Sequence, residues 1–152
     1  MIAGSDSPNS PGYLAGVQEE HRDLPGLVLT GYVAEEAVAG LFESAAVVAF
    51  PYTSTTGSSG VLHQVGEYGR AAVLPRIGDL VDIIEEEGFL GEYFEPDDPS
   101  SLATALSRVL NDEDLREHLG RNNFLAASGI PMSEVIDWHL IHLRRLIARR
   151  QQ

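Results

Sequence analysis

Short apolar runs alternate with helix-length segments along this chain, and that order limits the possible folds more than any other feature. The apolar runs have the length of strands and lie at residues 1–4, 27–30, 46–50, 71–74 and 92–95. The segments between them place apolar residues at helical spacing and lie at residues 10–23, 34–45, 61–68 and 80–87. Because strands separated by helices pair in parallel, the sequence predicts an α/β fold: a doubly wound, Rossmann-like parallel sheet flanked by helices.

Helix boundaries are marked by capping residues at several points. Ser10 is the expected N-cap of the first helix, with Pro11 at its first position. Asp98 and Pro99 open a helix that extends to about residue 110, and helices alone follow from about residue 112. The chain has no repeat or linker, and its 152 residues suit one domain. We therefore expect a single domain over residues 1–152.

Composition excludes several classes of partner. The chain carries 23 acidic residues against 10 basic ones, all of them arginine, for a net charge of −13. A nucleic-acid-binding protein needs a basic face, so nucleic acid is not an expected partner. No apolar run approaches the roughly 18 residues that span a bilayer, so no transmembrane segment is expected. The absence of cysteine suits a cytoplasmic protein; we leave open a peripheral membrane association of the full enzyme.

The loop after the third apolar run carries the strongest chemical signal. Ligands of an open parallel sheet bind beyond the carboxyl ends of its strands. Here a buried run ending at Phe50 and Pro51 enters a loop rich in Gly, Ser and Thr that closes at Gly60, where a helix follows. Glycines allow close backbone approach, and the N-terminus of a helix attracts anions. Gly/Ser/Thr loops are also ordinary connectors, so a phosphate site is one of two interpretations of this loop.

The order of motifs around this loop resembles the donor-binding segment of group 1 glycosyltransferases of the GT-B fold. In that family a strand ends in proline and a loop with Glu-Gly-Phe-Gly. A helix reading Glu-Ala-Met-Ala-x-Gly, a Pro-Val-Val-Ala strand and a Gly-Gly turn follow. The corresponding segments of this chain are 56–60, 64–69, 71–74 and 78–79. Residues 1–4, 29–33 and 94–110 resemble further family segments, so the resemblance covers nearly the whole chain.

The resemblance implies a C-terminal, donor-binding GT-B domain of a hexosyltransferase whose donor substrate is a nucleoside-diphosphate sugar, with no other cofactor. Backbone N–H groups of the loop would hold the phosphates, and two residues of a preceding turn would lie near the base. Two positions of the family's glutamate pair would contact the transferred sugar and the ribose. The implied nucleotide-sugar-binding residues are Tyr32, Val33, Thr56, Gly57, Ser58, Ser59, Gly60 and Gln64. No catalytic residue is assigned.

Two departures from the family pattern bear on activity. The glutamate pair is replaced by Thr56 and Gln64, which removes charge-assisted hydrogen bonds to the donor. The resemblance also begins one strand late, so the first strand of the domain, with its basic residues, and the acceptor-binding N-terminal domain are missing. We therefore expect part of a larger enzyme that is inactive alone. The N-terminal acceptor domain, a partner chain or a homodimer formed by strand exchange would complete it.

Other interpretations remain open. A degenerate module could act as a partner or regulatory subunit, or the chain could belong to a nucleotide-sugar epimerase. Ser58 or Ser59 with His63 does not form the Gly-x-Ser-x-Gly motif of hydrolases, and His63 is more simply a packed histidine. Arg76 follows the carboxyl end of a strand, so contact with a diphosphate and a surface role are equally favoured for it. No metal site is predicted, because the glutamates at 85–87 lack ligand spacing and His139 and His142 lack a third ligand.

Overall fold

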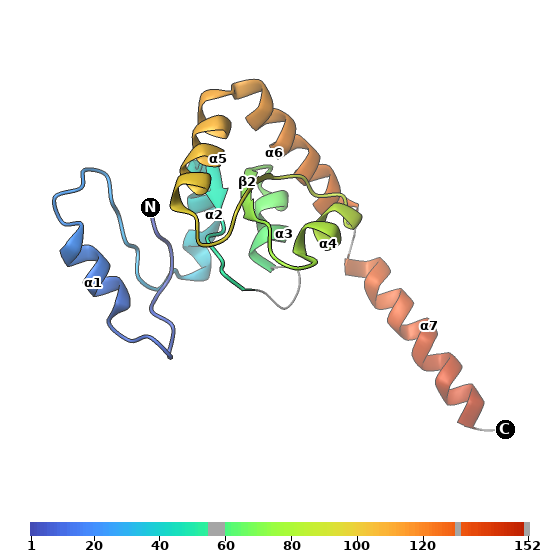
Figure 1. Cartoon of the computed structure of the whole chain (residues 1–152). Coiled ribbons are helices and arrows are strands. Elements are labelled where there is room, and N and C mark those ends of the chain that lie inside the picture. The colour runs from blue at the N-terminus through green and yellow to red at the C-terminus, as the bar shows by residue number, and fades with distance from the viewer. Residues whose placement is uncertain (55–59, 130–131, 151–152) are drawn as a thin grey trace. The chain divides into compact units, whose positions relative to one another are not determined.

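The computed structural model describes residues 1–54, 60–129 and 132–150, which fall into two compact units, Met1–Leu41 and Phe42–Gln152. The first unit contains α1 (Tyr13–Glu20) and most of α2 (Glu35–Ser44). The second contains the strands β1 (Val47–Ala49), β2 (Ala71–Pro75) and β3 (Glu92–Phe94). Its helices are α3 (Gly60–Glu67), α4 (Leu80–Glu86), α5 (Pro99–Asn111), α6 (Glu113–Ser128) and α7 (Met132–Arg150). Figure 1 labels most of these elements.

The three strands of the second unit form a parallel sheet in the order β1-β2-β3 among the described residues. Val47 pairs with Ala71, and Val73 pairs with Glu92. All five residues of β2, the middle strand, are buried. A parallel strand that is covered on both faces can be apolar throughout, which explains why residues 71–74 form a continuous apolar run rather than an alternating one.

Each face of this sheet packs against its own set of helices. On one face Ala72, Leu74 and Phe50 join the buried residues Leu62, Val65, Leu80, Ile84 and Phe89 of α3, α4 and the turn after α4. On the other face Ala71, Val73 and Phe94 join Ala105, Val109 and Leu119 of α5 and α6. Adjacent residues of a strand point to opposite faces, so β2 contributes to both clusters. The predicted doubly wound α/β fold is confirmed.

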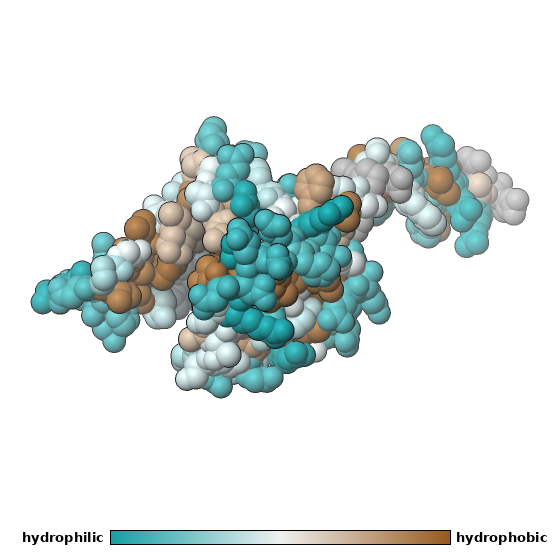
Figure 2. Space-filling model, turned by 90° about the horizontal axis from the view of Figure 1, so that it is seen from above, coloured by the Kyte–Doolittle hydropathy of each residue, from teal (hydrophilic) through white to brown (hydrophobic). Residues whose placement is uncertain are grey.

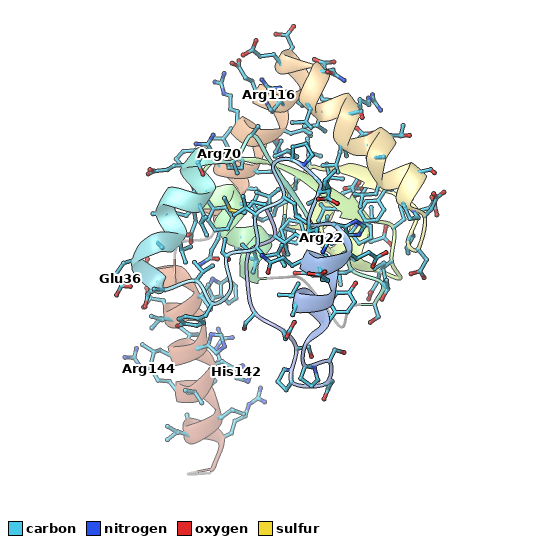
Figure 3. The ribbon with its side chains drawn as sticks, turned by 90° about the vertical axis from the view of Figure 1, so that its left-hand side faces the viewer. Arg22, Glu36, Arg70, Arg116, His142 and Arg144 are labelled. Carbon is cyan, nitrogen blue, oxygen red and sulfur yellow. The ribbon has the colours of Figure 1, made fainter. Side chains whose placement is uncertain are left out.

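Most predicted element boundaries in the second unit agree with the structure to within a residue or two. Asp98 caps α5, because its carboxylate accepts hydrogen bonds from the backbone N–H groups of Ser100 (2.9 Å) and Ser101 (3.0 Å). Asp112 caps α6 by accepting from the N–H of Leu115 (2.9 Å). At the junction of these two helices, Arg116 donates to the carbonyl oxygens of Val109 and Leu110, which end α5 (Figure 3).

The first unit differs from prediction in two respects. Residues 1–4 and 27–30 were expected to form strands, but they form only isolated bridges, Ile2 with Leu29 and Gly4 with Gly31. Ser10 does not cap α1. The N-cap is Gly12, at φ 82°, and its N–H donates to the carboxylate of Asp6 (2.7 Å). The positive φ at Gly12 ends the preceding turn, so the helix begins later than the Ser10-Pro11 pair predicts.

The two units also differ in how far their side chains are buried. No described residue from Met1 to Ala49 is buried, whereas the buried residues lie between Phe50 and Asn123. The first unit therefore has no apolar core of its own. The prediction of a single domain stays a prediction.

One buried asparagine links the strands of the second unit to α6. Asn123 is fully buried. Its Oδ1 accepts from the N–H of Leu90 (2.8 Å), just before β3, and its Nδ2 donates to the carbonyl of Arg70 (3.2 Å), just before β2. Close packing surrounds it, because a Cβ at Gly66 of α3 would lie 2.7 Å from the Asn123 carbonyl oxygen and 2.7 Å from Phe89. These contacts fix α3, the helix that follows the loop predicted to bind phosphate, against α6.

The last helix, α7, exposes apolar and basic side chains together. Trp138 is 73% exposed, and Ile136, Leu143 and Ile147 are each more than half exposed. Figure 2 shows brown, hydrophobic residues among teal, hydrophilic ones along α7, at the right of the view. Within the described residues, no helix combines the length and the apolar character that a membrane span requires.

Candidate functional site

The carboxyl ends of β1, β2 and β3 form the edge of the sheet where a ligand is expected. Their register places Ala49 beside Val73 and Pro75 beside Phe94. Beyond these ends the chain continues into Tyr52, Arg76 and Glu95, which are all exposed. Because the three strands are parallel, all three segments leave the sheet at the same edge. We call this edge of the sheet, formed by the carboxyl ends of β1, β2 and β3, the carboxyl edge.

The helix α3 begins at Gly60 and leads from the carboxyl end of β1 back to the amino end of β2, because the two strands are parallel. Its inner face is anchored by Leu62 and Val65, which are buried in the core. Gln64, predicted to bind the donor, is half-buried, and its side chain has no hydrogen-bond partner among the described residues. The first turn of a helix carries N–H groups without intrahelical partners and a partial positive charge. The structure thus places Gly60 and Gln64 on the first turns of a helix that starts at the carboxyl edge.

The other predicted loop residues, Thr56, Gly57, Ser58 and Ser59, lie outside the described residues. Tyr32 and Val33 belong to the first unit, where they follow Gly31. Tyr32 is 82% exposed, and Val33 is half-buried. The prediction that these six residues bind a nucleotide sugar stays a prediction.

His63 packs rather than projecting freely. Its ring stacks on Phe89, with centroids 5.3 Å apart and an interplanar angle of 17°. Its Nε2 lies 3.3 Å from Oε2 of Glu87, at the end of α4. These contacts join α3 to α4 and agree with the packed-histidine interpretation. They also account for Glu87, one of three consecutive glutamates for which no metal site was predicted.

Arg76 lies at the end of β2 and is held by β3. Its backbone N–H donates to the carbonyl of Phe94 (2.9 Å). Its guanidinium carbon lies 4.9 Å from the ring centroid of Tyr93, which is a cation–π contact. The hydroxyl of Tyr93 donates in turn to Glu85 (3.1 Å). Burial first, and then this hydrogen bond, raise the pKa of Tyr93 well above its usual range, so the ring stays neutral beneath the guanidinium. No sequence pattern predicts this contact between Arg76 and Tyr93.

Arg70 lies at the opposite end of β2 and does not share this edge. It precedes the first residue of the strand, and its Nη1 donates to the carbonyl of Ala45 (3.3 Å), just before β1 (Figure 3). Its buried Nε has no partner among the described residues. A nucleotide at the carboxyl edge would lie a full strand length away. Arg70 is therefore structural, linking the amino ends of β1 and β2.

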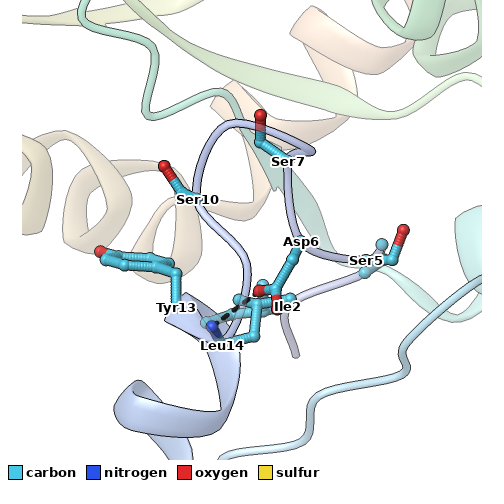
Figure 4. A pocket seen from close by; sticks show the side chains of 9 residues that line it. Ile2, Ser5, Asp6, Ser7, Ser10, Tyr13 and Leu14 are labelled. Carbon is cyan, nitrogen blue, oxygen red and sulfur yellow. Dashed lines mark hydrogen bonds between the residues drawn. The ribbon is translucent and has the colours of Figure 1, made fainter.

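The first unit contains a hollow of about 310 Å³ next to the bridge at Gly4 (Figure 4). Its lining residues include Ser5, Asp6, Ser7, Ser10 and Tyr13. The Asp6 carboxylate is already occupied, because it accepts from the N–H groups of Gly12 (2.7 Å) and Leu14 (2.8 Å) at the start of α1. These bonds satisfy the helix N-terminus that could otherwise attract an anion. No cluster of metal-binding side chains occurs among residues 1–54, 60–129 and 132–150.

Comparison with known proteins gives one family. The family model described as "Glycosyl transferases group 1" matches residues 1–112. A search of curated sequences returned no match.

Two solved structures share the fold. Sucrose-phosphate synthase from Thermosynechococcus elongatus superposes with a TM-score of 0.76 at 21% sequence identity, over 97% of this chain and 38% of that chain. Anabaena HepE, solved with UDP and glucose, superposes with a TM-score of 0.69 at 16% identity, over 84% of this chain and 35% of that chain. This chain thus corresponds to little more than a third of either protein.

The family match covers the first unit, the sheet and α3 to α5, and the structural matches cover the same α/β layers. Both agree with the motif order around the loop after β1. The chain belongs to the group 1 glycosyltransferase family and has the Rossmann-like α/β fold of GT-B glycosyltransferases.

Proposed function

We propose that this chain is the donor-binding part of a glycosyltransferase and binds a nucleoside-diphosphate sugar at the carboxyl edge. The observation that carries the proposal is the family match over residues 1–112, which includes every element that forms this edge. The similar fold of HepE, which was solved with UDP and glucose, supports a nucleotide sugar as the ligand class. The position of Gly60 and Gln64 on the first turns of α3 supports the carboxyl edge as its site.

Such a domain contributes to transfer mainly through electrostatics. When the bond between the sugar and the diphosphate breaks, negative charge grows on the leaving group. Backbone N–H groups and a helix N-terminus stabilise that charge without having to reorganise. A hexose would then pass to an acceptor bound elsewhere. We propose that this takes place in the cytoplasm, with no cofactor beyond the donor substrate itself.

The acceptor site would come from chain outside these residues. The structural neighbours are much longer than this chain, which spans 38% and 35% of them. β1 has a strand on one side only among the described residues, and its sequence, Val47-Val48-Ala49, carries no charge that would discourage pairing. A strand from the rest of the enzyme, from a partner or from a second copy would pair there, and the 152 residues alone would be inactive.

The proposal is tested by calorimetric titration of the chain with UDP, GDP and ADP, and then with their glucose conjugates. Saturable one-to-one binding of at least one nucleoside diphosphate is expected, and a Gly60→Trp variant should abolish it by filling the start of α3. Gly40→Trp on α2 is the control, because a Cβ added at Gly40, like one added at Gly60, meets no atom within 4 Å. Absence of binding by every nucleotide, both for this chain and for a version extended by a strand that pairs with β1, contradicts the proposal.

A non-catalytic module is the second candidate, and it is favoured by one observation. Gln64 stands where the family has the glutamate that binds the ribose, and no described residue fixes its side chain. A Gln64→Glu variant separates the two candidates. A large gain in nucleotide affinity indicates a decayed site, whereas a loss indicates a site that is adapted to its own donor.

A further inference from the structure

Arg76 is unusual among the basic residues of this chain because of its place on the sheet. Among the described arginines it alone follows the carboxyl end of a strand. Arg70 precedes β2, and Arg108 lies on α5 and pairs with Glu92, the first residue of β3, at 2.9 Å. The remaining described arginines lie near the end of α1 or on α6 and α7. The carboxyl edge therefore has a single described guanidinium.

The guanidinium of Arg76 is positioned but not neutralised. Its guanidinium carbon lies over the Tyr93 ring, 4.9 Å from the ring centroid. Its one ion pair is long: Nε lies 3.8 Å from Oε1 of Glu95, and the two side chains are 55% and 67% exposed. Exposed pairs of this kind contribute little, because water screens them. Arg76 is thus able to exchange Glu95 for a stronger anion.

Arg76 follows the carboxyl end of β2, at the same edge of the sheet at which the chain leaves β1. The N–H of Phe50 donates to the carbonyl of Val73 (3.0 Å), and Ala49 pairs with Val73. Beyond this pair the chain leaves the course of β1 in a turn at Pro51, where the N–H of Tyr52 donates to the carbonyl of Phe50 (2.7 Å), whereas β2 continues to Pro75 and Arg76 follows it. A strand spacing of about 4.8 Å separates β1 from β2. A ligand held where the chain leaves β1 would lie within the reach of an arginine side chain.

We propose that Arg76 binds the diphosphate of the donor nucleotide. This inference rests on the proposed function. A chain with a net charge of −13 repels an anion, so a site for diphosphate needs local positive charge. The planar guanidinium matches the spacing of phosphate oxygens and forms two parallel hydrogen bonds to them. The Tyr93 ring holds this group in place before the ligand arrives, which lowers the entropy lost on binding.

The test compares Arg76→Gln with Arg108→Gln by calorimetric titration. Both variants change the net charge by the same amount, but Arg108 lies on α5 and pairs with Glu92 at the amino end of β3. We expect Arg76→Gln to weaken UDP binding at least about tenfold and uridine binding by less than about twofold. Arg108→Gln should change neither. Arg76→Lys should recover part of the loss, because lysine restores the positive charge but lacks the planar pair of N–H donors that the guanidinium offers.

Two outcomes overturn the proposal, and each is distinct from failure of the proposed function. If the wild-type chain binds UDP and Arg76→Gln binds it as well as Arg108→Gln does, Arg76 does not contact the diphosphate. If Arg76→Gln weakens uridine and UDP equally, its role is structural; urea unfolding of the variant, compared with wild type, checks this independently. If the wild-type chain and its strand-extended version bind no nucleotide, the proposed function itself fails, and this inference fails with it.

Discussion

Replacing Asn123 with alanine should destabilise the second unit more than any other single truncation of a polar side chain. The residue is fully buried, and its amide makes two hydrogen bonds to backbone groups that precede β2 and β3. The variant leaves the N–H of Leu90 and the carbonyl of Arg70 without their partner. Each buried group left unsatisfied costs about 1–3 kcal/mol. We therefore expect the free energy of unfolding to fall by about 2–4 kcal/mol, a large part of the usual 5–15 kcal/mol.

Asn122→Ala is the matched control, because it lies next to Asn123 on α6. Its Nδ2 donates to the carbonyl of Gly88 at 2.7 Å, but in an exposed position where water can replace it. The gain in helix propensity from Asn to Ala is the same in both variants and cancels in the comparison. We expect Asn122→Ala to cost less than about 1 kcal/mol.

Urea unfolding followed by far-ultraviolet circular dichroism measures both variants. Trp138 is a poor fluorescent probe for this purpose, because it is 73% exposed on α7. With a typical urea m-value of about 1–3 kcal/mol/M, the midpoint for Asn123→Ala should fall by about 1–2 M. Equal midpoints for the two variants would show that Asn123 does not hold the strands to α6, and would refute the reasoning.

Further predictions concern packing, charge and ionisation. Gly66→Ala should cost about 1–3 kcal/mol, because its Cβ would meet Asn123, Phe89 and Ala127 within 2.9 Å, whereas Gly40→Ala on α2 meets nothing within 4 Å and should be neutral or stabilising; urea unfolding checks both. Asp6→Asn should weaken α1, because it removes the negative charge and one of the two acceptor oxygens that face Gly12 and Leu14; amide hydrogen exchange in residues 13–20 would show it, and unchanged exchange would contradict it. Since the pKa of Tyr93 is raised on folding, its neutral form contributes stability that is present below about pH 10 and lost as pH rises above it. Tyr93→Phe should flatten that alkaline loss of stability in thermal unfolding scans, and an unchanged pH profile would contradict the assignment.

Local sequence patterns predicted the fold of the second unit because the relevant interactions are local or periodic. The apolar run at 71–74 indicated a strand that is covered on both faces, and the aspartates at 98 and 112 marked helix starts through bonds within three residues. Residues 1–4 and 27–30 carry the same kind of apolar run, yet they form only bridges. A strand needs partners as well as composition, and within the described residues these two segments bridge only to each other.

The candidate site was predictable only in outline. Gly60 and Gln64 follow a buried strand in sequence, so their place at the start of α3 could be predicted. The support of Arg76 could not, because Tyr93 comes from another strand and is brought there by register. The same holds for the bonds of Asn123, which span 33 and 53 residues. The prediction that Ser10 caps α1 was wrong for a similar reason: the N-cap is Gly12, and its N–H donates to Asp6, six residues earlier in the chain.

The most direct test is to map the residues at which UDP binds this chain. Amide NMR spectra recorded during a UDP titration report the chemical shift of each backbone N–H group separately. We predict the largest shifts at the carboxyl edge, around Tyr52, Gly60–Gln64 and Arg76, with little change at Arg70 and Glu92 on the opposite edge. Shifts concentrated at the amino edge, or confined to the first unit, would contradict the claim that the carboxyl edge of this sheet binds the donor nucleotide.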